Sequence, residues 1–161
     1  MHDQTTPRPG REEYTATCDV NTLNSLLRGE VAAVETYDQV IGKFDGQSQA
    51  IELHRIRDEH NEAAAVLRER IRHFGGEPAE DSGAWGTFTK AVAGTAKILG
   101  PVSALGALKQ GEDYGIGQYE TALNDPDIDS DCKDLIRYRL LPRCRSHVGD
   151  LDRIIDAIDR Q

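Results

Sequence analysis

An internal repeat constrains the fold of this chain more than any other feature. The segment LNSLLRGEVAAVETYDQVI, residues 23–41, recurs as LGALKQGEDYGIGQYETAL, residues 105–123, at a shift of 82 positions. Apolar residues in both copies alternate between spacings of three and four, which places them on one face of an α-helix. Each copy also has one glutamate on that face, Glu30 and Glu112. Because a buried carboxylate is costly, these two residues are the main indication of a functional site.

A second repeat relates the other two apolar stripes of the chain. Residues 48–74 align with the C-terminal stretch at a shift of 87, which places His60 on His147 and Arg57 on Cys144. Stripe spacing, capping residues and the stop signals Asp-Gly, Gly-Gly and Asp-Pro then define the helices. Together they predict four helices, over residues 19–44, 48–74, 101–124 and 129–159.

These helices predict an all-α fold, an antiparallel four-helix bundle made of two helical hairpins. The hairpins cover residues 19–74 and 101–160, and a long crossover connection, residues 75–100, joins them. Such a connection can place the third helix parallel to the first. We expect Trp85 and Phe88 to anchor the crossover on the bundle, with a short helix from about Thr87 to Leu99.

Residues 1–17 are polar and lack apolar periodicity, so they predict a flexible N-terminal tail before a domain that covers residues 18–161. Pro142 interrupts the fourth stripe and should kink that helix or leave a carbonyl free one turn earlier. Glycines such as Gly111 in the third helix should allow another segment to approach closely.

Composition excludes several classes of function. The chain has 28 acidic and 19 basic residues, a net charge of −9, whereas nucleic-acid binding needs a basic face. The first residues lack an apolar signal region, which predicts a cytoplasmic protein, and a membrane partner is not expected. Three cysteines without a CxxC pair do not indicate a disulfide framework. A bundle of this type is expected to form a homo-oligomer, as a dimer.

Each predicted helix places polar groups in its apolar stripe at a comparable depth. The groups that can bind a metal are Glu30, His60, Glu112 and His147. Side chains that could support these ligands or substitute for one of them are Arg57, Cys144, Tyr37 and Tyr119. Four helices that meet in one layer can satisfy these groups mutually, or they can hold a metal ion.

The chain from about residue 20 to 160 resembles a bacterial ferritin-like four-helix-bundle family of unknown function. The resemblance lies in RGEVAAVETY and QGEDYGIGQYE, in RDEHNEAAAVLRERIRHFGG, and in LLPRCRSH. Ferritin-like di-iron or di-manganese bundles take one glutamate from each of two helices and Glu-x-x-His from each of the other two. The resemblance therefore implies a metal site and a role in metal handling or stress response.

This sequence departs from that ligand pattern, since Arg57 and Cys144 stand where two glutamates are expected. Two glutamates and two histidines favour one ion, of iron, manganese or zinc, over two. The arginine places a positive charge where a second ion would lie. A Cys144 thiolate would shift the preference toward zinc. The pattern thus disfavours the usual ferroxidase or oxygenase activity, assigns no catalytic residue and leaves open whether the protein is an enzyme.

The alternative interpretation is a structural or interaction module without metal. The buried Glu, Arg and His residues would then be the remnant of a di-iron site, with Arg57 neutralising one or both glutamates. Tyr37 and Tyr119 are expected to pack in the core with their hydroxyls hydrogen-bonded. Glu59 lies off the stripe, and it joins the site only if the second helix is rotated from its predicted orientation.

Overall fold

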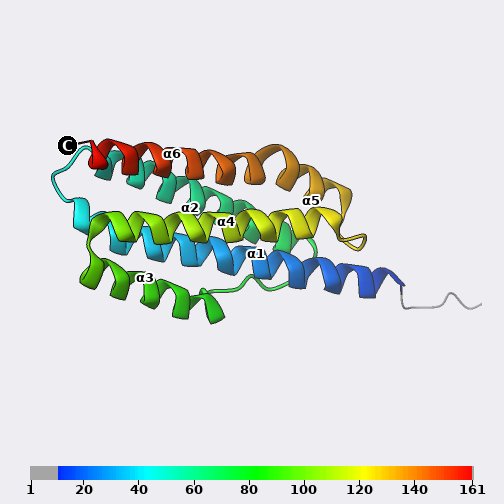
Figure 1. The fold of residues 1–161 in the computed structure, drawn as a ribbon. Helices are drawn as coiled ribbons and strands as arrows, with labels where there is room; N and C mark the ends of the chain where they lie inside the picture. Colours follow the sequence, from blue (N-terminus) through cyan, green and yellow to red (C-terminus); the bar gives the residue numbers. More distant parts are fainter. Residues whose placement is uncertain (1–10, 161) are drawn as a thin grey trace, which may run out of the picture.

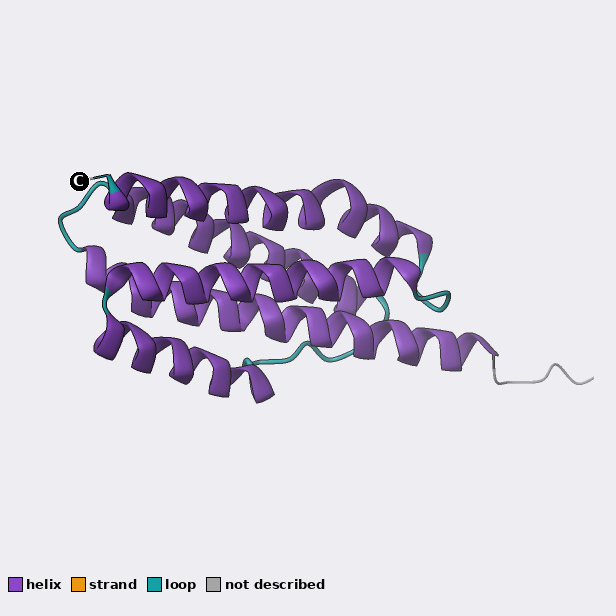
Figure 2. Ribbon diagram, viewed as in Figure 1, coloured by secondary structure: helices purple, strands orange, loops and turns teal. Residues whose placement is uncertain are grey.

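The computed structural model describes residues 11–160, and within this range it is entirely helical, with no strand. Figure 2 shows these helices and the loops between them. The helices are α1 Arg11–Ile41, α2 Gln49–His73, α3 Gly86–Leu99, α4 Pro101–Asn124, α5 Ser130–Leu135 and α6 Leu141–Asp159. The prediction of an all-α fold is confirmed. No helix in the described part of the chain is long and apolar enough to span a membrane.

Helices α1, α2, α4 and α6 run alongside one another, and α3 lies outside them against α1 and α4 (Figure 1). The most extensive contacts join α1 to α2 and α4 to α6, as expected for two hairpins. Helix α4 runs antiparallel to α1, so the prediction of a parallel arrangement is wrong. The reason is that α3 carries the chain back along the molecule, and α4 begins near the end of α1 (Figure 1).

The first helix begins at Arg11, eight residues before its predicted start. The backbone of residues 11–17, which the sequence prediction placed in the tail, is helical, and residues 1–10 lie outside the described part of the chain. The segment lacks an apolar stripe, which was the signal used to predict the helix start.

The crossover is fixed to the bundle by aromatic contacts, as predicted. The ring centroid of Trp85 lies 4.6 Å from that of Tyr114 on α4, in an edge-on arrangement. The Phe88 ring lies so close to Gly111 that a Cβ at this glycine would be 3.2 Å from it. After α3 the chain turns at Gly100, whose φ of +90° favours glycine, and Pro101 begins α4.

The predicted fourth helix is one helical path with a π-helical turn, Ile136–Leu140, between α5 and α6. In this turn the backbone N–H of Leu141 donates to the carbonyl of Ile136, five residues earlier. Pro142 follows immediately and has no N–H for the carbonyl one turn back. The sequence predicted that Pro142 would disturb the helix, and the π-helical turn is how the backbone accommodates it.

The apolar core consists of two clusters separated along the helix axes by a polar layer. On α1 one cluster takes Leu23, Leu26 and Leu27 and the other takes Tyr37, Val40 and Ile41, with Glu30 between them. Helices α2, α4 and α6 divide in the same way around His60, Glu112 and His147. Residues that the two repeats place at equal depth are therefore brought into one layer.

Two glycines on α4 test the role of the crossover contact. Gly117→Ala adds a Cβ that meets nothing within 4 Å, so the protein should become more stable by about 0.5–1 kcal/mol. Gly111→Ala should give a smaller gain, or a loss, because the Phe88 ring must move. Denaturant unfolding of both variants measures the difference. Equal gains in the two variants would show that Phe88 does not pack tightly on Gly111.

Candidate metal centre

Each of four helices contributes one predicted ligand to the polar layer: Glu30 from α1, His60 from α2, Glu112 from α4 and His147 from α6. All four residues are at most 6% exposed. These are the four predicted metal ligands, and the structure places all of them in this layer. Their burial means that each must find its hydrogen-bond partners within the protein.

His60 joins the two glutamates of the repeat. Its Nδ1 lies 2.7 Å from Glu30 Oε2, and its Nε2 lies 2.9 Å from Glu112 Oε1. Ionised carboxylates only accept hydrogen bonds, so both ring nitrogens carry hydrogen and the ring is an imidazolium. One buried cation thus neutralises two buried anions in part.

Each tyrosine of the repeat reaches from its own helix to the glutamate on the other helix. Tyr37 on α1 donates its hydroxyl hydrogen to Glu112 Oε1 at 2.6 Å, and Tyr119 on α4 donates to Glu30 Oε1. Each tyrosine lies seven residues after the glutamate of its own helix, and the antiparallel packing brings it to the glutamate of the other. Both hydroxyls are therefore satisfied, as expected for buried tyrosines.

His147 on α6 approaches Glu112 from the other helix of the same hairpin. Its Nδ1 lies 3.4 Å from Glu112 Oε2, and its Nε2 lies 2.8 Å from Glu59 Oε2. The Cys144 thiol also reaches Glu112, with Sγ 3.1 Å from Oε2. The centroids of the His60 and His147 rings are 4.8 Å apart, so the two imidazoles and the carboxylate converge.

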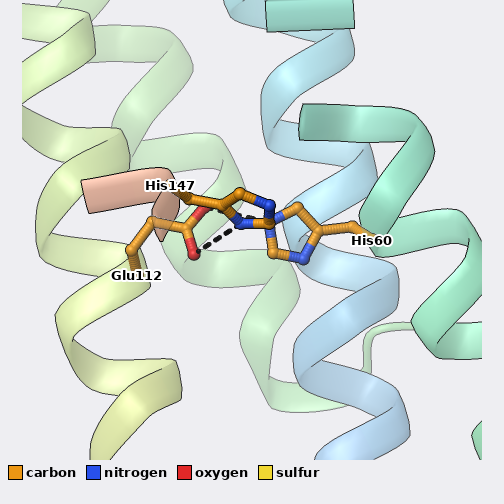
Figure 3. Close-up of side chains that lie close together, drawn as sticks. All are labelled: His60, Glu112 and His147. Atoms are coloured by element: carbon orange, nitrogen blue, oxygen red, sulfur yellow. Dashed lines mark hydrogen bonds and ion pairs between the residues drawn. The ribbon is translucent and has the colours of Figure 1, made fainter. Parts of the chain in front are cut away.

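Three of the four predicted ligands form a cluster of the size that holds a metal ion. One ligand atom each from His60, Glu112 and His147 can be chosen so that all lie within 4.8 Å of one another. Figure 3 shows these side chains pointing toward one another from α2, α4 and α6. Glu30 lies at the other ring nitrogen of His60, outside this cluster.

An outer network, which the sequence did not predict as a whole, supports His147. Glu59 accepts from Arg55, and Arg55 also donates to Asp150, which is 3% exposed. Arg153 donates to the same aspartate. A usable signal was present, because Asp150 lies three residues after His147 and so shares its helix face. Glu59 takes part although its side chain is 23% exposed, which makes it the solvent-side end of the layer.

Arg57 does not belong to the site, so the prediction that it lies in the seam is wrong. Its guanidinium pairs with Asp38 and Asp58 on the surface. Ile56 is fully buried in its place. The cause is helical periodicity, because a step of four residues from Ile56 reaches His60 and keeps both on the buried face. The structure therefore does not support the predicted neutralisation of Glu30 or Glu112 by Arg57.

The electrostatics of the layer depend on the pair of opposite charges at its centre. Burial lowers the pKa of His60, but the charges of Glu112 and Glu30 outweigh it, so the pKa of His60 is raised well above its ordinary value. Burial alone would raise the pKa of Glu112. The His60 charge and the hydrogen bonds from His147 and His60 reverse this, and the Glu112 pKa is lowered. The layer therefore holds Glu112 as a carboxylate and His60 as a cation.

The tyrosine and cysteine side chains of the layer are held in their neutral forms. Burial raises the pKa of the Tyr37 and Tyr119 hydroxyls, and the nearest carboxylate raises it further. Burial and the Glu112 charge also raise the pKa of the Cys144 thiol. Cys144 is thus a thiol hydrogen-bonded to Glu112 rather than the thiolate that a zinc ligand requires.

The sequence of this chain matches one known protein family. A family model described as a domain of unknown function, DUF2383, matches residues 19–125. The chain belongs to this family. The DUF2383 segment includes Glu30, His60 and Glu112, whereas His147 and Cys144 lie beyond it. Searches of curated proteins and of solved structures gave no match.

The charge of His60 predicts a pH dependence of stability for the metal-free DUF2383 protein. Its folded pKa is raised, so the stabilisation is complete below the unfolded pKa of about 6.5 and is lost as pH rises toward the folded pKa. The free energy of unfolding should fall as pH rises above about 6.5, by up to about 1.4 kcal/mol per pH unit, until the pH has passed the raised folded pKa. Urea unfolding in the presence of a chelator measures this slope.

Two variants attribute that slope to one residue. His60→Gln should be less stable near pH 6.5 and should lose the slope, because the buried cation is gone. His54→Gln, which changes an exposed histidine on the same helix, should keep the slope of the wild type. An unchanged slope in His60→Gln would mean that His60 is not charged in the folded protein.

Proposed function

We propose that this protein is a ferritin-like four-helix bundle that holds one divalent metal ion. The ligands in this proposal are His60 Nε2, His147 Nδ1 and the Glu112 carboxylate. The observation that supports it is the convergence of these three buried side chains from three helices within 4.8 Å. Two imidazoles and one carboxylate are a donor set that suits zinc, iron(II) or manganese(II) and leaves coordination positions for water.

The carboxylates around the cluster support the same assignment. Histidine ligands usually donate their second ring N–H to a carboxylate, which fixes the orientation of the ring. Glu30 lies at Nδ1 of His60, and Glu59 lies at Nε2 of His147. In both histidines the nitrogen that remains faces Glu112. We therefore propose that Glu30, predicted from the sequence as a direct ligand, orients His60.

The geometry favours one ion over two because only one side of the layer collects ligands. His60 and His147 both face Glu112, whereas the Glu30 side offers His60 Nδ1 and the Tyr119 hydroxyl. Cys144, which stands where the di-iron pattern has a glutamate, adds a thiol to the layer in place of a third carboxylate. A bound ion would supply Lewis acidity or, as iron or manganese, redox chemistry. The chain positions the ligands, buries them between two apolar clusters and gives up the proton of His60 Nε2. A role in metal handling or stress response follows from the resemblance to ferritin-like proteins.

One observation favours the alternative, a metal-free structural module. Each of the four buried charged or imidazole groups already has a hydrogen-bond partner within the layer. A satisfied polar layer can fix the register of four helices without any ligand. In that case the layer specifies the fold, and interaction partners would carry the function.

Elemental analysis of tag-free protein, purified without chelators, separates these proposals. We expect about one ion per chain in the wild type. Glu112→Gln and His147→Ala should lose it, because each removes a direct ligand. Arg57→Ala provides the control, since its side chain pairs with surface aspartates and the metal content should not change. Absence of metal after reconstitution with iron, manganese and zinc would support the metal-free module.

Glu30→Gln tests whether Glu30 is a ligand or an orienting residue. Loss of a carboxylate that orients a histidine ligand typically lowers metal affinity by about 10–100-fold. We therefore expect Glu30→Gln to bind one ion with affinity reduced in this range, measured by competition with a chromogenic chelator. Complete loss of the ion, equal to that in Glu112→Gln, would make Glu30 a direct ligand as the sequence suggested.

A further inference from the structure

A cavity of about 60 Å³ lies between α1 and α4 and reaches the polar layer. Trp85 and Phe88 of the crossover form its wall on the side of α3. The inner end is polar and includes Glu30, Glu112 and the two tyrosines. Apart from this end most of the wall residues are apolar, among them Gly29, Ala32, Ala33, Leu108, Gly111 and Gly115, and three are polar, Ser25, Thr36 and Gln118.

The cavity exists because the repeat places a glycine before each glutamate. A Cβ at Gly29 would meet nothing within 4 Å, so this position opens directly onto free space. At the equivalent Gly111 a Cβ would meet the Phe88 ring at 3.2 Å. Glycine in a helix interior lowers stability. The presence of two such glycines beside a buried charged layer therefore indicates that the space is kept open rather than filled by side chains.

Size and charge limit what the cavity can hold. One water needs about 10–15 Å³ of such volume, so the space fits a molecule of about four to six non-hydrogen atoms. The two glutamates and the His60 cation leave a net negative charge at the inner end, which disfavours anions. A cation would be attracted by that charge, but it would lose far more hydration than a neutral group, and beyond the inner end the walls offer mainly the polar side chains of Ser25, Thr36 and Gln118 to replace it. A small neutral molecule remains.

The inner end also has hydrogen-bonding capacity left over. A carboxylate can accept about four hydrogen bonds. Among the described residues, Glu30 accepts one from His60 and one from Tyr119, on different oxygens. Both of its oxygens therefore have room for a further donor, and Glu30 lines the cavity. A ligand with an O–H group could donate to it.

We propose that this cavity binds a small neutral molecule with an apolar body and one hydroxyl group, of the short-chain alcohol class. The hydroxyl donates to Glu30, and the alkyl part lies against the small residues of α1 and α4. The site does not require the metal ion, because its walls and its acceptor are present without one. Its test is therefore performed on protein treated with a chelator, and its outcome is separate from that of the metal analysis.

The single tryptophan of the chain, Trp85, lines the cavity and reports binding directly. We expect 1-butanol to change its fluorescence in a saturable way, with a dissociation constant on the order of 1 mM. Butyrate has the same alkyl chain but carries a negative charge, and it should bind at least 10-fold more weakly. Butylammonium tests the opposite charge, and tighter binding of it than of 1-butanol would replace the neutral ligand class by a cationic one and overturn the proposal. A linear response to 1-butanol, or butyrate binding as tight as that of the alcohol, would overturn the proposal.

A variant that fills the space distinguishes the cavity from nonspecific solvent effects. Gly29→Leu should abolish the saturable response, because the new side chain occupies the site. Gly117→Leu is the matched control, since this glycine is exposed on α4 and its Cβ would meet nothing within 4 Å; its response should equal that of the wild type. If Gly29→Leu does not fold, Ala33→Leu fills the same cavity from the next turn of α1. Saturable binding retained in a folded filling variant would place the alcohol elsewhere.

Discussion

The interaction on which this structure depends is the buried ion triad of Glu30, His60 and Glu112. Desolvation of two carboxylates is unfavourable, and the shared imidazolium offsets it only because its two nitrogens reach both groups at hydrogen-bond distance. This requirement fixes the rotation of α1, α2 and α4 about their axes. Removal of one partner from such a buried set typically costs about 3–5 kcal/mol, since the remaining charges are left uncompensated. The apolar clusters on either side pack in a register that keeps the triad intact.

The internal repeat explains both the order in this layer and its asymmetry. Because Tyr37 and Tyr119 follow their glutamates by the same seven residues, antiparallel packing lets each donate to the other copy's glutamate. The second pair of helices breaks this symmetry. His60 lies between the two repeat glutamates, whereas His147 lies between Glu112 and Glu59. Two ring nitrogens thus face Glu112 and one faces Glu30, which is the physical basis for a single proposed ion.

Periodicity in the sequence predicted the helices, the antiparallel hairpins and the depth of the four polar residues, because each depends on local spacing. The sequence predicted less well which side chains contact one another and in which direction each helix runs. Arg57 and Ile56 are neighbours, and a small rotation of α2 decides which one is buried. The apolar stripe of this helix did not show which of the two faces the core. The direction of α4 depends on how far α3 travels along the bundle, which no local pattern encodes. The Glu59 side chain is partly exposed and still reaches His147, so its role depends on how α2 and α6 pack against each other.

The proton on His60 Nε2 links the charge balance of the layer to the proposed binding of an ion. In the metal-free protein this proton supplies positive charge next to Glu112, so the layer is neutralised in part and the helices can pack without an ion. An ion in the proposed site would take the same place and must displace the proton, which couples binding to pH. Folding and metal binding would then be separable, in contrast to small domains that fold only around their metal. The glycine before each glutamate fits this view, because a layer that already satisfies its own charges can tolerate an open cavity beside it.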